Sequence, residues 1–152
     1  MSLRSYPELG FTDSHHSQTH HHGEQEKIAK VIQINTLHTK MLAYYLDKLR
    51  NTADGDGSLL DHSMIMYGAA LSDANLHRYD DLPILLVAGG VNGIKGGQHL
   101  KYPQRTPLTN LLVTMLDKAG VPGVERLGDS TGKLELAAST PRSADASQRK
   151  TL

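Results

Sequence analysis

The sequence has no cysteine, no tryptophan and a single phenylalanine among its 152 residues. The absence of cysteine excludes disulfides, thiolate catalysis and cysteine-ligated zinc sites, and it leaves the redox compartment open. With so few aromatic residues, the core has to be built from Leu, Ile, Val and Met. No apolar run approaches the ~18 residues of a membrane-spanning helix, so we expect no membrane span. The first residues also lack the apolar stretch of a secretory signal peptide.

An excess of charge of one sign is lacking as well. Sixteen Lys and Arg residues balance sixteen Asp and Glu residues, so the formal net charge is zero. This balance provides neither the basic surface of a nucleic-acid-binding protein nor a polybasic membrane anchor, and we expect no nucleic-acid partner. The length is typical of about one domain. The residue type present in unusual number is histidine, with nine copies.

One long helix is the strongest structural signal. Residues 1–23 have no usable periodicity and are predicted to form a His-rich loop. From Glu24 onward, apolar residues recur at steps of three and four, which predicts a helix over 24–51. Its predicted buried face comprises Ile28, Val31, Ile32, Asn35, His38, Leu42, Tyr45, Leu46 and Leu49. Asn35 and His38 on that face are interpreted as a core pair, the alternative being that both face a polar cavity.

Two short apolar runs, 63–68 and 82–88, are bounded by turn residues and do not alternate cleanly. Such runs are typical of strands covered on both faces, as in an α/β sheet. A second helix is predicted over 106–119, with Thr106 able to cap it and Pro107 suited to its first position. Residues 137–152 have no apolar periodicity and are predicted to be a disordered tail. The fold class is therefore α/β, a partial sheet covered by helices over 24–136, with too few elements for a complete sheet.

The histidine cluster is the first candidate site. Five imidazoles lie within eight residues, from His15 to His22. Neutral imidazole is the commonest metal ligand, so a divalent metal site is one interpretation. The alternatives are an interrupted affinity tag and a solvated polar loop. The cluster ends just before the long helix, whose N-terminus favours anions.

The second candidate follows the first predicted strand, where ligands of open α/β sheets are bound. Asp73 and His77 could bind a metal there, with Asn75 as a neutral oxygen donor. The alternative is an ordinary polar turn in which Asp73 and Asn75 bond to their own backbone.

A glycine-rich stretch from Gly89 to Gly97 is the third candidate. Lys95, Gly96 and Gly97 could bind an anion through backbone N–H groups and one positive charge, with His99 nearby. A flexible strand connection is the alternative, because neither a P-loop nor a dinucleotide pattern is present, and no organic cofactor is expected. The stretch 54–57 has part of a calcium-loop pattern but is interpreted as a turn. No Gly-x-Ser-x-Gly elbow is present, and the catalytic residues are unknown.

The order of these motifs resembles the carboxy-terminal part of the HXXSHH family, a group of uncharacterised and usually longer bacterial proteins. Residues 16–21, His-Ser-Gln-Thr-His-His, are similar to the family signature, with Thr19 in the usual serine position. The resemblance runs from about residue 7 to residue 136 and includes the segments 55–63, 72–77, 82–86, 95–97 and 128–132. Because such proteins often carry a twin-arginine export signal, the resemblance implies export to the periplasm or cell envelope.

A more distant resemblance is to the carboxy-terminal half of alkaline-phosphatase-like and sulfatase-like enzymes. It implies a zinc, manganese or iron ion held by His77 and Asp73, joined by His16, His20 and His21. It also implies a missing amino-terminal half, or another chain, as partner. We therefore expect a fragment of an exported metal-dependent hydrolase of phosphate or sulfate esters, inactive alone. The alternatives are a non-catalytic module that binds metal or anions, and a purely structural piece with solvated histidines.

Overall fold

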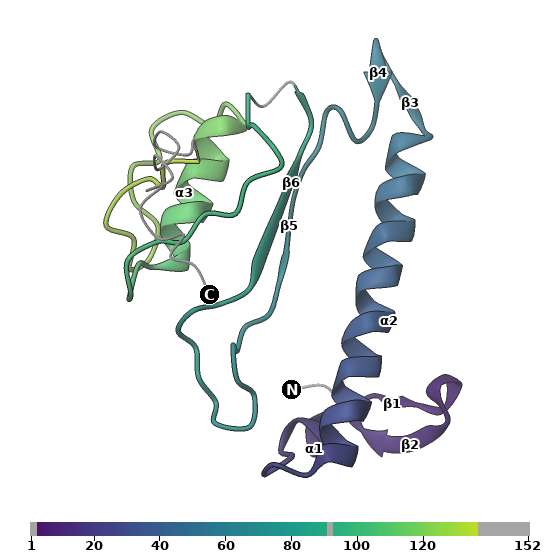
Figure 1. Cartoon of the computed structure of the whole chain (residues 1–152). Helices are drawn as coiled ribbons and strands as arrows, with labels where there is room; N and C mark the ends of the chain where they lie inside the picture. The colour runs from purple at the N-terminus through teal and green to yellow at the C-terminus, as the bar shows by residue number, and fades with distance from the viewer. Residues whose placement is uncertain (1–2, 91–92, 137–152) are drawn as a thin grey trace, which may run out of the picture. The chain divides into compact units, whose positions relative to one another are not determined.

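The computed structural model describes residues 3–90 and 93–136. The chain divides into two units, residues 1–92 and residues 93–152 (Figure 1). Helices and small antiparallel sheets are both present, which confirms a mixed α and β composition. The predicted disordered tail, 137–152, lies outside the described residues.

The first residues form regular structure, and the prediction of a loop over 1–23 is wrong. β1 (Ser5–Tyr6) pairs in antiparallel fashion with β2 (Phe11–Ser14). The 3-10 turn η1 (Pro7–Leu9) connects them and ends at Gly10, whose positive φ of 87° suits glycine. α1 (His15–Thr19) follows at once. Elements of two to five residues are too short to produce a detectable hydrophobic period, which is why the sequence pattern missed them.

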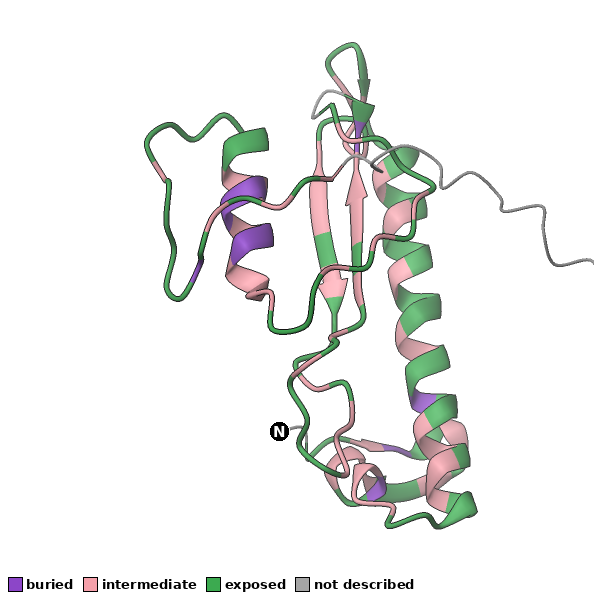
Figure 2. Ribbon diagram, turned by 60° about the vertical axis from the view of Figure 1, so that its left-hand side comes forward, coloured by how far each residue is buried: buried purple, intermediate pink, exposed green. Residues whose placement is uncertain are grey.

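The predicted long helix is confirmed as α2 (Gln25–Arg50), but its buried face differs from the prediction. Ile34 is fully buried, whereas Ile32, Asn35 and Tyr45 are exposed. β1 and α1 also have one buried residue each, and Figure 2 shows the buried parts of β1, α1 and α2 toward the same end of α2. Burial along this helix thus depends on which neighbours pack against it. Asn35 is consequently not a core partner of His38.

A tight hairpin follows α2. β3 (Ala53–Asp54) pairs with β4 (Gly57–Ser58), and Gly55 has a φ of 58° in the turn between them. This confirms the interpretation of 54–57 as a turn, since a two-residue hairpin turn needs positive φ. The imidazole of His62 then contacts the carboxylates of Asp54 and Asp56, with nitrogen–oxygen distances of 3.0 and 3.3 Å.

The two predicted strands are confirmed as β5 (Met64–Gly68) and β6 (Ile84–Ala88). They form a two-stranded antiparallel sheet in which Met66 pairs with Leu86 and Tyr67 pairs with Leu85. Side chains alternate along a strand, so each face of this sheet carries large apolar groups. The expected cover on both faces is incomplete, because Met66 is 37% exposed and Leu85, on the other face, is 49% exposed.

Gly89, which directly follows β6, packs closely against Asp61 in the segment before β5. A Cβ atom at Gly89 would overlap the backbone of Asp61, so only glycine fits there. The N–H of Gly89 also donates to the carbonyl of Ser63 at 2.9 Å. Tyr67 of β5 and four residues of α2 line a hollow of about 320 Å³. The four residues of α2 are His38, Met41, Leu42 and Tyr45.

The second unit is built on α3 (Leu108–Lys118), which confirms the predicted helix with a later start. Pro107 is the N-cap residue, and Thr106 does not cap because its hydroxyl donates to the carbonyl of Pro103. Polar residues of α3 hold the chain that follows. The amide of buried Asn110 donates to the Thr131 hydroxyl at 3.0 Å and accepts from the Thr131 N–H at 2.8 Å. No helix of residues 3–90 and 93–136 has both the length and the apolarity needed to cross a bilayer.

Candidate metal centre

The histidine-rich segment is organised by α1. Ser14 caps this helix, with its hydroxyl oxygen accepting from the N–H of Ser17 at 3.2 Å. His16 and His20 are four residues apart, the spacing that places side chains on the same face of a helical turn. Their ring centroids are 4.7 Å apart with the planes at 87°, so one ring points its edge at the other.

His77 reaches the same place from the connection between β5 and β6. This connection turns back on itself through the bridge between Asp73 and Arg78, with the Arg78 N–H donating to the Asp73 carbonyl at 2.9 Å. His77 lies within the turn in a left-handed conformation, with a φ of 52°, which is uncommon for a residue with a side chain. Its ring centroid is 4.9 Å from that of His20, again edge to face at 88°.

A backbone contact joins the same two segments. The N–H of His22 donates to the side-chain oxygen of Asn75 at 3.0 Å, across 53 positions of sequence. His22 is also left-handed, with a φ of 47°, and its ring lies 6.3 Å from that of His20 at only 24°. His20 is therefore the common neighbour of three other imidazoles, which we call the His20 cluster: His16, His20, His22 and His77.

The electrostatics of the cluster favour the neutral ring. Partial burial lowers the pKa of His20, and the nearby imidazoles of His16, His77 and His22 lower it further. Desolvation and like charges both disfavour the protonated form. A metal ion binds the neutral form, which is the form that the lowered pKa of His20 favours.

Two of the predicted ligands, His21 and Asp73, make hydrogen bonds within their own turns. Nδ1 of His21 accepts from the N–H of Gly23 at 3.1 Å, in the turn before α2. Oδ1 of Asp73 accepts from the N–H groups of Asn75 and Leu76 at 2.9 and 3.1 Å. This is the polar-turn alternative for Asp73, whose carboxylate stabilises its own loop.

The predicted anion site belongs to the second unit. Lys95, Gly96 and Gly97 are exposed there, and the carbonyl of Lys95 accepts from the Gln98 amide at 2.7 Å. Gly97 has a positive φ of 72°, a backbone conformation that glycine adopts readily. Anion binding at these residues stays a prediction.

The ring spacing of the cluster can be compared with the spacing that a metal requires. Two imidazoles on one tetrahedral zinc, with Zn–N bonds near 2.0–2.1 Å, have centroids about 5 Å apart. The separations of 4.7 and 4.9 Å match that spacing. As the rings stand, no three His, Asp or Glu side chains of residues 3–90 and 93–136 are placed to hold an ion. Rotation of the edge-to-face rings about their broad terminal torsions is therefore required before their nitrogens can converge.

Sequence reasoning identified only part of a second group of rings. The hydroxyl of buried Tyr6 and Nε2 of His38 are hydrogen-bonded at 2.9 Å, and the His15 ring lies 6.0 Å from both rings. We call Tyr6, His15 and His38 the Tyr6 cluster. It joins β1, α1 and α2, and burial lowers the pKa of His15, with smaller effects from His38 and His16. The position of His38 on an apolar helix face indicated a core role, but nothing indicated Tyr6 as its partner.

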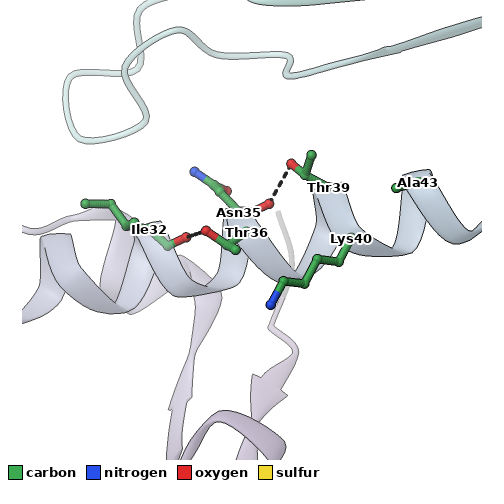
Figure 3. Close-up of a pocket in the computed structure, with 6 residues that line it drawn as sticks. All are labelled: Ile32, Asn35, Thr36, Thr39, Lys40 and Ala43. Carbon is green, nitrogen blue, oxygen red and sulfur yellow. Dashed lines mark hydrogen bonds between the residues drawn. The ribbon is translucent and has the colours of Figure 1, made fainter.

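A larger hollow of about 440 Å³ runs along the side of α2 (Figure 3). It is lined by Ile32, Asn35, Thr36, Thr39, Lys40 and Ala43. Both threonine hydroxyls donate to helix carbonyls, Thr36 to Ile32 and Thr39 to Asn35. The remaining polar groups are one amide and one ammonium, so this hollow has no acid–base or metal-binding set.

Comparison of the chain with protein-family models, with curated proteins and with solved structures found no match in any of the three. The resemblance to the HXXSHH family and to alkaline-phosphatase-like enzymes therefore stays a prediction from sequence motifs.

Proposed function

We propose that the first unit binds a divalent transition-metal ion through the imidazoles of His16, His20 and His77. The observation that supports this is the spacing of the rings. Two imidazoles from distant parts of the chain lie 4.7 and 4.9 Å from a third, close to the separation of about 5 Å on one zinc ion.

The donor set indicates which ions bind. Three imidazoles suit zinc, copper and nickel, whereas oxygen ligands suit manganese, magnesium and calcium. One carboxylate oxygen of Asp73, Oδ1, accepts hydrogen bonds within its own turn, so the three imidazoles are the donors on which the proposal rests. We therefore place zinc first among the ions that the sequence suggested, and manganese last.

A metal held by three imidazoles supplies a Lewis acid and lowers the pKa of bound water. Hydrolysis of a phosphate or sulfate ester, within a protein that also supplies a nucleophile, is the second candidate function. The resemblance to the carboxy-terminal half of alkaline-phosphatase-like enzymes favours it. In a non-catalytic module, the ion would instead only tie α1 to the loop between β5 and β6.

Metal analysis of the purified full chain tests the proposal. We expect one zinc per chain after dialysis, and loss of it in the double variant His16→Ala with His77→Ala. The variant His99→Ala is the matched control, because His99 lies in the second unit. A substoichiometric metal content, or a double variant that retains zinc, would overturn the proposal.

Activity distinguishes the two candidate functions. Because the hydrolase hypothesis expects this chain to be inactive alone, the assay uses a longer protein in which an amino-terminal half is joined to it. The zinc-loaded longer protein is assayed with aryl phosphates and aryl sulfates, each with His77→Ala beside it. Turnover that disappears in the variant supports ester hydrolysis, and stoichiometric zinc without turnover in the longer protein supports the binding module.

A further inference from the structure

The sheet of the first unit consists of β5 and β6 alone (Figure 1). Among residues 3–90 and 93–136, no third strand pairs with either of them. A two-stranded sheet becomes stable when further strands or a helix cover it. Here the cover is incomplete, because Met66 and Leu85 are exposed on opposite faces. The sheet therefore has two outer edges that can accept another strand.

The hydrogen bonds at the two ends of the sheet show which backbone groups point outward. The N–H of Gly89 donates to the carbonyl of Ser63 at 2.9 Å, and the N–H of Ala69 donates to the carbonyl of Pro83 at 3.4 Å. Along an antiparallel pair, hydrogen-bonded and non-hydrogen-bonded residue pairs alternate. With the register of β5 and β6, the residues whose N–H and C=O groups point away from the sheet are Met64, Met66 and Gly68 on β5, and Ile84, Leu86 and Ala88 on β6.

Neither edge is protected against pairing. Within the described ranges, no hydrogen bond joins the outward backbone groups to another part of the chain. Proteins usually guard an open edge with a charged residue, a proline or a bulge. β5 and β6 contain no charged residue and no proline, and their register runs without a shift through all five pairs.

The edge of β6 is better suited to strand addition than the edge of β5. β6 consists of branched aliphatic residues and one alanine, whereas β5 ends in Gly68, a residue that weakens a strand. β6 also carries Leu85, which is 49% exposed. Residues 82–90 contain no charge, so an antiparallel pairing of this segment with itself places no like charges opposite each other.

We propose that β6 pairs in antiparallel fashion with β6 of a second copy of the chain, which gives a two-fold dimer with a continuous four-stranded sheet. Leu86 then lies opposite the partner's Leu86, and Ile84 lies opposite the partner's Ala88. In this register every outward N–H and C=O group of β6 has a partner. Leu85 lies beside the partner's Val87 in a non-hydrogen-bonded pair, in which side chains approach most closely. The dimer needs no metal ion and does not depend on the proposed function.

A pair of proline variants tests the edge. Leu86→Pro removes an outward N–H of β6, and Met66→Pro removes the equivalent N–H of β5. Both leave the hydrogen bonds between the two strands in place, because proline is tolerated where the N–H faces outward. We expect sedimentation of the full chain over a concentration series to show a dimer. Leu86→Pro should raise its Kd roughly tenfold or more, since the two-fold axis removes two hydrogen bonds at once. Met66→Pro should leave the Kd within a few-fold.

A charge exchange tests the register. Leu86→Lys places two ammonium groups opposite each other in the dimer but not in the monomer, so it should prevent dimerisation, as should Leu86→Glu. A mixture of the two variants should form a mixed dimer, because the opposite charges then face each other. Met66→Lys is the matched control, since Met66 pairs with Leu86 and lies on the same face of the sheet but on the other strand.

Amide hydrogen exchange gives an independent readout. At concentrations where the chain is dimeric, we expect the outward amides of β6 to be protected and those of β5 to exchange quickly. A chain that stays monomeric at every concentration would overturn the proposal and leave this edge to a strand of a different protein. A dimer that survives Leu86→Lys, that Met66→Pro disrupts instead, or that grows into larger assemblies would also overturn it. Recovery of the mixed dimer shows that the single variants are folded.

Discussion

Two groups of imidazoles begin at adjacent residues, His15 and His16, and their surroundings differ. In the Tyr6 cluster, His38 has a hydrogen-bonded partner in a buried tyrosine, and the rings join three elements. In the His20 cluster, the rings contact one another, and His77 and His22 occupy uncommon left-handed conformations. Satisfied hydrogen bonds explain the first group as part of the core. Uncommon backbone conformations tend to gather at functional sites, which is how we interpret the second group.

The largest expected effect comes from replacing the central ring of the His20 cluster. We expect His20→Ala to weaken zinc binding by roughly a hundredfold or more, since even changes to outer-shell partners cost about 10–100-fold. His15→Ala, which removes a ring from the same short helix but from the other cluster, should leave zinc affinity within a few-fold. Calorimetric titration measures both. Equal losses in the two variants would remove the distinction between the clusters.

Zinc itself should stabilise the first unit. An ion that binds the folded state and not the unfolded state adds about 4 kcal/mol to the free energy of unfolding at a thousand times its Kd. Urea unfolding followed at a tyrosine of the first unit, with and without zinc, measures this difference. A chelator should abolish it. Stabilisation that persists in His20→Ala would mean that the ion binds elsewhere.

The Tyr6 cluster should respond to mutation through stability instead. His38→Ala leaves the hydroxyl of Tyr6, which is 1% exposed, without its partner. We expect a loss of about 1–3 kcal/mol in the free energy of unfolding, the cost of an unsatisfied buried polar group. Adding Tyr6→Phe to this variant should recover part of the loss. Zinc affinity is the control measurement and should not change in either case.

A third environment, at His62, should have the smallest effect and a pH dependence. Hydrogen bonding to Asp54, and then the charges of Asp54, Asp56 and Asp61, raise the pKa of His62 above its ordinary value of 6.5. Below pH 6.5 the imidazolium is charged in both states, so the ion pairs contribute their full stability. This contribution is lost as the pH rises from 6.5 through the raised value in the folded state.

The measurement for His62 is the free energy of unfolding between pH 5 and pH 9, compared with that of His62→Asn. The difference between the two chains should shrink as the pH increases and should be small throughout, because the carboxylates are exposed. An NMR titration of the His62 ring gives the pKa directly. A value at or below 6.5 would contradict the expected direction.

Particular residues show how far sequence reasoning reached. The helix over 24–51, the two strands and the turn at 54–57 were predictable because hydrophobic period and turn chemistry are local properties. β1, β2 and α1 were not predictable, although Ser14 is a favourable N-cap residue and could have indicated α1. In the site, His16, His20 and His77 were predicted and lie together, whereas Asp73 and His21 are occupied by hydrogen bonds of their own turns. His22 was part of the candidate histidine segment but not of the predicted ligand set, and the buried Tyr6 was not predicted as the partner of His38.

The sequence by itself determined the helices α2 and α3, the strands β5 and β6 and the turn at 54–57, because those choices depend on neighbours a few positions away. It also determined that nitrogen, rather than sulfur, would be the donor of any soft metal site. Only the tertiary structure decided that the loop after β5 lies against α1, that Ile34 is the buried residue of α2, and that His15 and His16 join different clusters. These outcomes depend on contacts between residues dozens of positions apart, whose geometry no local pattern encodes.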